Sequence, residues 1–222
     1  MIGKHVLVWG MARSGVAAAK LLNDAGAYVR INDLKTAEAL GDSMAPLKAE
    51  GIEWRLGEPV ENCLDGMDMM VISPGIPAEQ PAVALARSKG IEVIGEVELA
   101  YRLGRGHVVA VTGTNGKTTT TTLLGEIFKN AGRISYVVGN IGDPYSAYAS
   151  QMKDDDMVVC ELSSFQLETI HTFRPRVSAI LNITPDHLNR HHTMENYVKA
   201  KQDITKNQTK EDYCVLNAED PY

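Results

Sequence analysis

The sequence has few cysteines, no long apolar run and no excess of basic residues. Its three cysteines, Cys63, Cys160 and Cys214, are odd in number and far apart, which fits neither a disulfide framework nor a thiolate zinc site. No stretch approaches the roughly 20 consecutive apolar residues that span a bilayer. With 22 Lys and Arg against 28 Asp and Glu, the net charge is −6, and no basic block is present to neutralise a nucleic-acid backbone. We therefore expect a soluble, cytoplasmic protein without nucleic-acid or membrane partners.

The first part of the chain alternates expected strands with expected helices. The 222 residues are 44% hydrophobic, an ordinary globular composition that suits one large domain or two small ones. The apolar strand His5–Trp9 leads through the glycine turn Gly10–Gly15 into a helix, Val16–Ala25, which Gly26 ends. The further elements expected here are the strands Ala27–Asn32, Met67–Ile72 and Ile91–Ile94 and the helix Glu79–Lys89. Strands that alternate with helices predict a parallel, doubly wound sheet, which is a Rossmann-like α/β domain.

A second strand, loop and helix begin at His107, after a helical pattern at Glu96–Leu103 that connects the two parts. The elements expected there are the strands Val108–Thr112, Met157–Leu162, Val177–Asn182 and Tyr213–Asn217 and the helices Lys117–Ala131 and Thr193–Asn207. We place a domain boundary near Gly95. The sequence thus predicts an α/β fold with two domains, residues 1–94 and residues 95–222, the second of the P-loop type.

The strongest motif is a glycine-containing loop between an expected strand and helix. It consists of Gly113, Thr114, Asn115, Gly116, Lys117, Thr118 and Thr119. Backbone N–H groups and the positive end of the helix would point at an anion there. In such loops the lysine reaches the β- and γ-phosphates, and the hydroxyl of Thr118 would bind Mg²⁺. The glycine spacing departs from the usual pattern because Val111 stands five positions before Gly116. We expect a nucleoside triphosphate at this loop.

The glycine turn at Gly10–Gly15 is a weaker signal. Ala12 stands where the dinucleotide fingerprint has its middle glycine, so a pyrophosphate can approach the backbone less freely. Asp33 ends the second strand, where this fold places a carboxylate against a ribose hydroxyl. Alone, the turn is equally compatible with nucleotide binding and with a structural role. The turn Ser73-Pro74-Gly75 ends another strand at the same expected sheet edge, and this coincidence favours a ligand.

Two further strand ends carry groups that bind metals. Glu161 ends an apolar strand, a position from which its carboxylate could complete a Mg²⁺ site with Thr118 and phosphate. Asp186 and His187 also follow an apolar strand and could face the same edge. A strand-end carboxylate is often only solvated, and a lone histidine is usually structural; the phosphate-type loop upstream favours the functional interpretation.

Four segments, in this order and spacing, resemble the Mur ligases of peptidoglycan synthesis, and in particular the branch that adds D-glutamate. These segments are Gly113–Thr118, Glu161–Glu168, Asn182–His187 and Tyr197–Lys201, and the opening Gly10–Gly15 is similar as well. The resemblance covers essentially the whole chain. It implies an N-terminal domain that holds the UDP of a substrate and a central domain that binds ATP and Mg²⁺.

The resemblance also implies roles for individual residues. The UDP substrate would contact Ser14, Gly15, Asp33, Ser73, Pro74, Gly75 and Asn140. ATP would bind the loop Gly113–Thr119, and the metal ligands would be Thr118, Glu161, His187 and Lys201, the last as a carbamate. The catalytic group would comprise Lys117, Asn140, His187 and Lys201.

The reaction that the resemblance implies is ATP-dependent amide formation. The carboxylate of UDP-N-acetylmuramoyl-L-alanine would form an acyl phosphate, which the amine of D-glutamate then attacks. Members of the family have a third, C-terminal domain, whereas this chain stops at Tyr222 within the central domain; we therefore expect a truncated, monomeric fragment that binds ligands without turnover. The alternatives are a nicotinamide-dependent oxidoreductase that uses Gly10–Gly15 and Asp33, and a nucleotide-binding module without catalysis.

Overall fold

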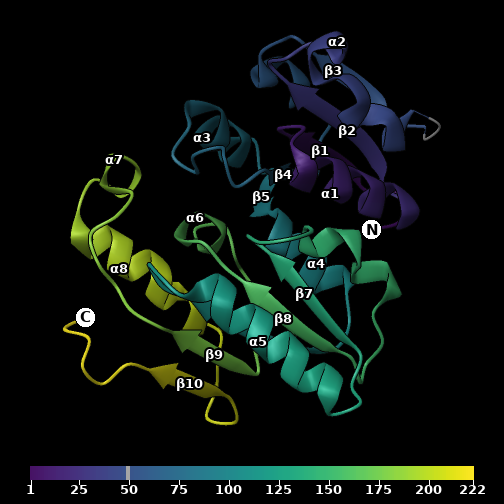
Figure 1. The fold of residues 1–222 in the computed structure, drawn as a ribbon. Helices are drawn as coiled ribbons and strands as arrows, with labels where there is room; N and C mark the ends of the chain where they lie inside the picture. The colour runs from purple at the N-terminus through teal and green to yellow at the C-terminus, as the bar shows by residue number, and fades with distance from the viewer. Residues whose placement is uncertain (49–50) are drawn as a thin grey trace.

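The computed structural model describes residues 1–48 and 51–222 and arranges them around two parallel β-sheets of five strands each (Figure 1). The first sheet has the order β3-β2-β1-β4-β5 and the second the order β10-β9-β6-β8-β7. Every pairing within both sheets is parallel. The α/β fold predicted from the alternating elements is confirmed.

The first sheet comprises residues 5–95. Its strands are β1 (His5–Trp9), β2 (Tyr28–Asp33), β3 (Glu53–Leu56), β4 (Met69–Ile72) and β5 (Glu92–Gly95). Its helices are α1 (Arg13–Asp24), α2 (Ala37–Leu40) and α3 (Pro81–Ser88), with 3-10 turns at Gly41–Leu47 and Val60–Cys63. All four residues of β4 are buried, because an interior strand of a parallel sheet, here between β1 and β5, is covered on both faces.

The second sheet begins after α4 (Glu96–Leu103). Its strands are β6 (His107–Thr112), β7 (Ser135–Gly139), β8 (Met157–Glu161), β9 (Val177–Ile180) and β10 (Tyr213–Leu216). Its helices are α5 (Lys117–Asn130), α6 (Ser164–Leu167), α7 (Leu188–His191) and α8 (Met194–Gln202), with 3-10 turns at Tyr145–Ala147, Ala149–Gln151 and Asp203–Thr205. Helix α5 lies across one face of this sheet (Figure 1).

Several expected element bounds differ from the structure. Strands β3 and β7 were not expected from the sequence, and helix α1 begins at Arg13 rather than at Val16. The helix expected to reach Asn207 ends at Gln202, where a 3-10 turn follows. None of these differences changes which strand ends carry the predicted site residues.

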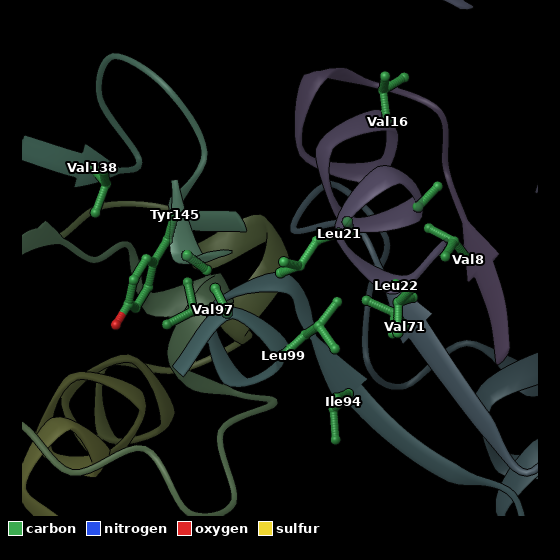
Figure 2. Close-up of a cluster of buried hydrophobic side chains, with 14 of the residues drawn as sticks. Val8, Val16, Leu21, Leu22, Val71, Ile94, Val97, Leu99, Val138 and Tyr145 are labelled. Carbon is green, nitrogen blue, oxygen red and sulfur yellow. The ribbon is translucent and has the colours of Figure 1, made fainter. Parts of the chain in front are cut away.

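One apolar cluster joins the two sheets through α4. It contains Val8 and Val71 of the first sheet, Val138 of the second, and Leu99 of α4, all nearly inaccessible to solvent. Figure 2 shows the α4 side chains between those of β1 and β4 on one side and Tyr145 and Val138 on the other. Burial of apolar surface is the main favourable term in folding, so the two sheets share part of their stabilisation.

Two buried carboxylates of α4 fix the helix to the second sheet. Glu96 accepts hydrogen bonds from the backbone N–H and the hydroxyl of Ser146, both at 2.6 Å. Glu98 accepts from the N–H groups of His171, Thr172 and Phe173, from the Thr172 hydroxyl and from Arg102. Burial alone raises the pKa of Glu98, but these hydrogen bonds outweigh it and bring the pKa to about 2.

All three cysteines are free thiols. Across residues 1–48 and 51–222, no helix combines the length and the apolar character that a membrane span requires.

Candidate functional site

The predicted phosphate loop, Gly113–Thr119, connects β6 to the first turn of α5. Gly116 has φ of +83°, a left-handed conformation that glycine adopts without strain, and it directly precedes the helix. The first N–H groups of a helix have no partner within the helix, and the helix dipole places positive potential at this end. The loop therefore presents an anion-binding helix end at the carboxyl edge of the second sheet.

Asn182, which follows β9, holds the phosphate loop in place. Its side-chain oxygen accepts from the N–H of Asn115 at 2.9 Å, and its amide donates to the Asn115 carbonyl at 3.0 Å. Its own carbonyl accepts from the N–H of Thr114 at 2.8 Å. Sequence reasoning gave Asn182 no role, although a polar residue directly after an apolar strand was the available signal.

The side chain of Lys117 folds back over the preceding residues of the phosphate loop. Its ammonium donates to the carbonyls of Gly113 and Thr114, at 3.0 and 2.9 Å. The charge is thus placed at the loop itself, within reach of an anion bound by the backbone N–H groups.

Lys201 approaches the same loop from α8. Its side chain is 2% exposed, and its ammonium donates to the Gly113 carbonyl at 2.7 Å. Burial, followed by repulsion from Lys117, lowers the pKa of Lys201 to about 7. A lysine with this pKa is a neutral, nucleophilic amine in a large fraction of molecules at neutral pH.

Thr118, Glu161 and Asn140 meet at the carboxyl end of β8. The Glu161 carboxylate accepts from the Thr118 hydroxyl and from the Asn140 side-chain amide, each at 2.9 Å. Glu161 is buried, and no lysine, arginine or histidine of the described residues forms an ion pair with it within 4.0 Å. A buried carboxylate with only neutral donors is an arrangement that favours a cation.

His187 lies apart from that group. Its ring packs against Phe165 with centroids 4.9 Å apart, and its Nε2 is 3.4 Å from Asp186. Among the residues described, His187 shares no hydrogen bond with Thr118, Glu161 or Lys201, and no cluster of three His, Cys, Asp or Glu is placed to hold a metal. The structure therefore brings together Thr118 and Glu161 but not the complete predicted ligand set.

Asp33 lies at the carboxyl edge of the first sheet and holds the glycine turn. Its two oxygens accept from the N–H groups of Met11 and Lys35, at 2.8 and 2.9 Å. The carboxylate is therefore anchored at the end of β2, beside the turn that enters α1.

Ser73, after β4, contacts the glycine turn from the other side. Its hydroxyl donates to the Gly10 carbonyl at 2.7 Å, and the hydroxyl of Ser14 lies 3.5 Å away. A Cβ at Gly15 would lie 1.9 Å from the Gly10 carbonyl oxygen, which explains why glycine is required there. The neighbours Pro74 and Gly75 continue the loop after β4. The predicted residues Ser14, Gly15, Asp33 and Ser73 thus meet at one sheet edge.

The fold and these two edges define a class: an α/β protein with two parallel sheets, one of which carries a phosphate-type loop between strand and helix. Comparison with known families gives the particular family. Residues 111–222 match the Mur ligase middle domain, and residues 4–95 match the Mur ligase MurD-like N-terminal domain. The chain belongs to the Mur ligase family.

Similar curated proteins carry one name. The chain is 55% identical over 219 residues to the UDP-N-acetylmuramoylalanine–D-glutamate ligase of Alkaliphilus oremlandii, covering 98% of this chain and 48% of that protein. It is 50% identical over 224 residues to the ligase of the same name from Lachnoclostridium phytofermentans, covering 100% of this chain and 49% of that protein. The chain thus spans about half the length of the curated relatives it matches.

Solved structures support the fold. A UDP-N-acetylmuramate:L-alanyl-gamma-D-glutamyl-meso-diaminopimelate ligase from Neisseria meningitides matches with a TM-score of 0.63 at 20% identity, covering 99% of this chain and 72% of that chain. A murein peptide ligase from Psychrobacter arcticus matches with a TM-score of 0.62 at 19% identity, covering 98% of this chain and 50% of that chain. The family match and the names of the curated relatives do not favour the oxidoreductase alternative.

Proposed function

We propose that this chain provides the UDP-substrate and ATP sites of an ATP-dependent ligase that adds D-glutamate to UDP-N-acetylmuramoyl-L-alanine for peptidoglycan. The observation that carries the proposal is the pairing of Thr118 in the phosphate loop with the buried carboxylate of Glu161. The names of the relatives at 55% and 50% identity supply the substrates. Residues 1–94 form the UDP-substrate domain of this proposal and residues 95–222 the ATP domain.

The oxygen atoms of the Thr118 hydroxyl and the Glu161 carboxylate suit Mg²⁺ as ligands. This ion commonly takes one or two carboxylates together with phosphate oxygens and waters, so a cluster of three acidic or histidine ligands is not required. Thr118 and Glu161 would hold the ion, with His187 and a carbamate on Lys201 as further ligands. The ion supplies positive charge next to the transferred phosphoryl group.

The residues of the chain supply position and charge for phosphoryl transfer. In the loop Gly113–Thr119, the N–H groups of Thr114 and Asn115 bond to Asn182, so those of Gly116–Thr119 at the start of α5 bind the phosphates of ATP. The Lys117 ammonium neutralises charge as the substrate carboxylate oxygen bonds to the γ-phosphorus and ADP leaves. Asn140, whose amide donates to Glu161 at 2.9 Å, would orient that carboxylate. An acyl phosphate can then expel phosphate when the amine of D-glutamate attacks, whereas a free carboxylate would have to expel oxide.

Lys201 is suited to carbamate formation. With a pKa of about 7, its neutral amine can attack CO₂; an N–C bond forms, the nitrogen loses a proton, and an anionic carbamate results. Without the modification, the protonated Lys201 is a buried cation that Lys117 repels. The carbamate is instead an anion next to the Lys117 ammonium. The modification also provides anionic oxygen atoms of the kind that Mg²⁺ prefers as ligands.

The UDP moiety binds at the edge of the first sheet, around Asp33 and Ser73. Ser14, Gly15, Pro74, Gly75 and the Asp33-bound turn line this edge at the switch between β1 and β4, where open α/β sheets bind ligands. We also propose that the protein is cytoplasmic, since UDP-linked precursors and ATP are cytoplasmic metabolites. For its oligomeric state we propose a monomer.

Isothermal titration of the chain separates the two sites. Lys117→Ala removes the charge that faces the triphosphate, and we expect it to abolish measurable Mg²⁺–ATP binding while affinity for UDP-N-acetylmuramoyl-L-alanine stays unchanged. The matched control is Lys129→Ala, which removes an exposed lysine near the other end of α5. Unchanged ATP affinity in Lys117→Ala would contradict the proposed role of the loop.

Asp33→Ala tests the UDP-substrate site, with ATP binding as the property that should stay unchanged. Because the Met11 N–H loses its acceptor, we expect affinity for the UDP substrate to fall by about 1–3 kcal/mol, with ATP binding retained. A parallel titration with NAD measures the oxidoreductase alternative, for which we expect no binding. Full UDP-substrate affinity in Asp33→Ala would refute this assignment.

A further inference from the structure

Arg190 of α7 bridges the two sheets outside the groups described above. Its guanidinium donates to the Glu168 carboxylate at 2.8 Å and to the Ile76 carbonyl at 3.4 Å, and it lies 4.6 Å from the centroid of the Phe165 ring. The side chain is only 13% exposed. Phe165 lies in α6, which Glu168 ends, in the second half of the chain, and Ile76 lies in the loop after β4 in the first, so one side chain contacts both halves.

The Ile76 end of this bridge reaches the proposed UDP site. The N–H of Ile76 donates to the Ser73 carbonyl at 2.9 Å. The Ile76 side chain also lies against Gly10, since a Cβ on Gly10 would come within 2.9 Å of the Ile76 Cδ1 atom. A ligand that fixes Ser73 and the glycine turn therefore also fixes the carbonyl that Arg190 binds.

The other end reaches the ATP site through a chain of packed rings. Phe165, under the guanidinium, stacks on the ring of His191 with centroids 5.4 Å apart. His191 is buried, and its Nε2 atom shares a hydrogen bond with the Ser164 hydroxyl at 2.8 Å. Its ring packs on Tyr197 with ring centroids 5.2 Å apart. The Tyr197 hydroxyl lies 3.1 Å from the hydroxyl of Thr114 in the phosphate loop.

We propose that Arg190 is a positioning residue that couples the UDP-substrate site to the ATP site through Ile76, Glu168 and Phe165. The inference rests on the proposed function, because it requires both ligands. When one ligand orders its end of the bridge, the second ligand has less conformational freedom to remove, and each therefore binds more tightly in the presence of the other. The guanidinium is planar, so it lies over the Phe165 ring while its N–H groups bond the carboxylate and the carbonyl; the compact ammonium of a lysine keeps the charge but not this planar stacking.

The linkage is measured directly by titrating the chain with UDP-N-acetylmuramoyl-L-alanine, with and without a saturating non-hydrolysable ATP analogue and Mg²⁺. For the wild type we expect the analogue to tighten UDP-substrate binding about fivefold or more. Arg190→Lys keeps the charge, and we expect each ligand alone to bind within about threefold of wild type while the linkage falls below about twofold.

His192→Ala is the matched control. His192 follows α7 directly and contacts Glu79 of the first half at 3.3 Å, but both side chains are well exposed. We expect this variant to keep the wild-type linkage. Thermal unfolding of all three proteins establishes that Arg190→Lys is folded under the titration conditions, and Arg190→Gln provides a second folded variant if the lysine destabilises the chain.

The outcomes separate this inference from the proposed function. Loss of linkage in Arg190→Lys alone supports the coupling role. Wild-type linkage in Arg190→Lys, or no linkage in the wild type despite binding of each ligand, overturns the inference and leaves the proposed function standing. A wild-type chain that binds neither ligand overturns both.

Discussion

Lys117 and Lys201 place two ammonium groups on one carbonyl oxygen. Both donate to the carbonyl of Gly113, at 3.0 and 2.7 Å, and Lys201 is buried. Desolvation and like charge both disfavour the protonated form, which is why the pKa of Lys201 falls while that of an exposed lysine would not. Burial against the phosphate loop, together with the charge of Lys117, thus favours the neutral amine form of Lys201, which is its nucleophilic form.

This shift predicts a pH-dependent stability. The pKa of Lys201 is about 7 in the folded chain against 10.5 for the free side chain, so between these values the unfolded state binds more protons. The free energy of unfolding should therefore rise with pH over this window, by at most about 1.4 kcal/mol per pH unit, and the burial penalty is complete below about pH 7. Urea unfolding of wild type and Lys201→Met in CO₂-free buffer measures the difference.

Lys210→Met, which removes an exposed lysine, is the control for that series and should run parallel to wild type. A constant difference between wild type and Lys201→Met from pH 7 to pH 10 would show that the folded-state pKa of Lys201 is not lowered.

At the residue scale, the sequence predicted which side chains stand at strand ends but not how they pair. The sequence shows that one strand ends in Glu161 and that the loop after another contains Thr118, but it does not show how β6 and β8 align. That alignment brings the Thr118 hydroxyl to 2.9 Å from the Glu161 carboxylate. Asn182 was overlooked for the same reason, because its two bonds to Asn115 depend on β9 lying beside β6. The role of Arg190 depends on a contact across 114 positions of sequence.

At the scale of elements, helix α4 is held by carboxylates rather than by apolar contacts alone. Glu98 ties the helix to three successive N–H groups at His171–Phe173, which lie just before β9. Ionised carboxylates that accept several N–H bonds form strong, charge-assisted interactions. The connection between the two sheets is therefore sensitive to the charge of one side chain.

Glu98→Gln should weaken this connection. The amide keeps one acceptor oxygen but turns an N–H₂ group toward donors, so we expect a loss of about 3 kcal/mol in the free energy of unfolding at neutral pH. Because the folded-state pKa of Glu98 is lowered from 4.5 to about 2, its stabilisation is present above pH 4.5 and disappears as the pH falls through about 2. Urea unfolding measures both effects.

The exposed Glu61 gives the comparison for that variant, since Glu61→Gln changes the same charge without a buried partner. Equal stability of the Glu98 and Glu61 variants at neutral pH would contradict the role given to Glu98.

Most elements could be predicted because glycine stops and apolar runs mark them, as at Gly26 and at β4. The strands β3 and β7 lie at sheet edges, but so do β5 and β10, which were expected, so the edge position alone does not explain why β3 and β7 were missed. The residues of β3 are half-buried or exposed, so they lack the continuous apolar run that identified the central strands. Edge strands of this kind are specified by pairing with β2 or β8, which a local pattern does not contain.

For the molecule as a whole, the cluster that runs through α4 makes the two halves depend on each other. Leu99 belongs to that cluster and has no exposed surface, and Figure 2 draws it between Val97 of the same helix and the side chains of the first sheet. Two domains joined only by a linker could unfold separately, whereas two sheets that share a core should lose their structure together.

The two tryptophans make this testable, because Trp9 in β1 and Trp54 in β3 both report on the first sheet. Far-UV circular dichroism reports on both sheets. We expect the two signals to follow one urea transition in the wild type, and Leu99→Ala to shift both midpoints together, with a loss of about 2–5 kcal/mol for a buried leucine. Leu123→Ala, on the exposed face of α5, should leave both midpoints in place. If fluorescence and circular dichroism gave separate transitions in the wild type, the sheets would be independent, and a substitution at Leu99 would then shift the two midpoints by different amounts.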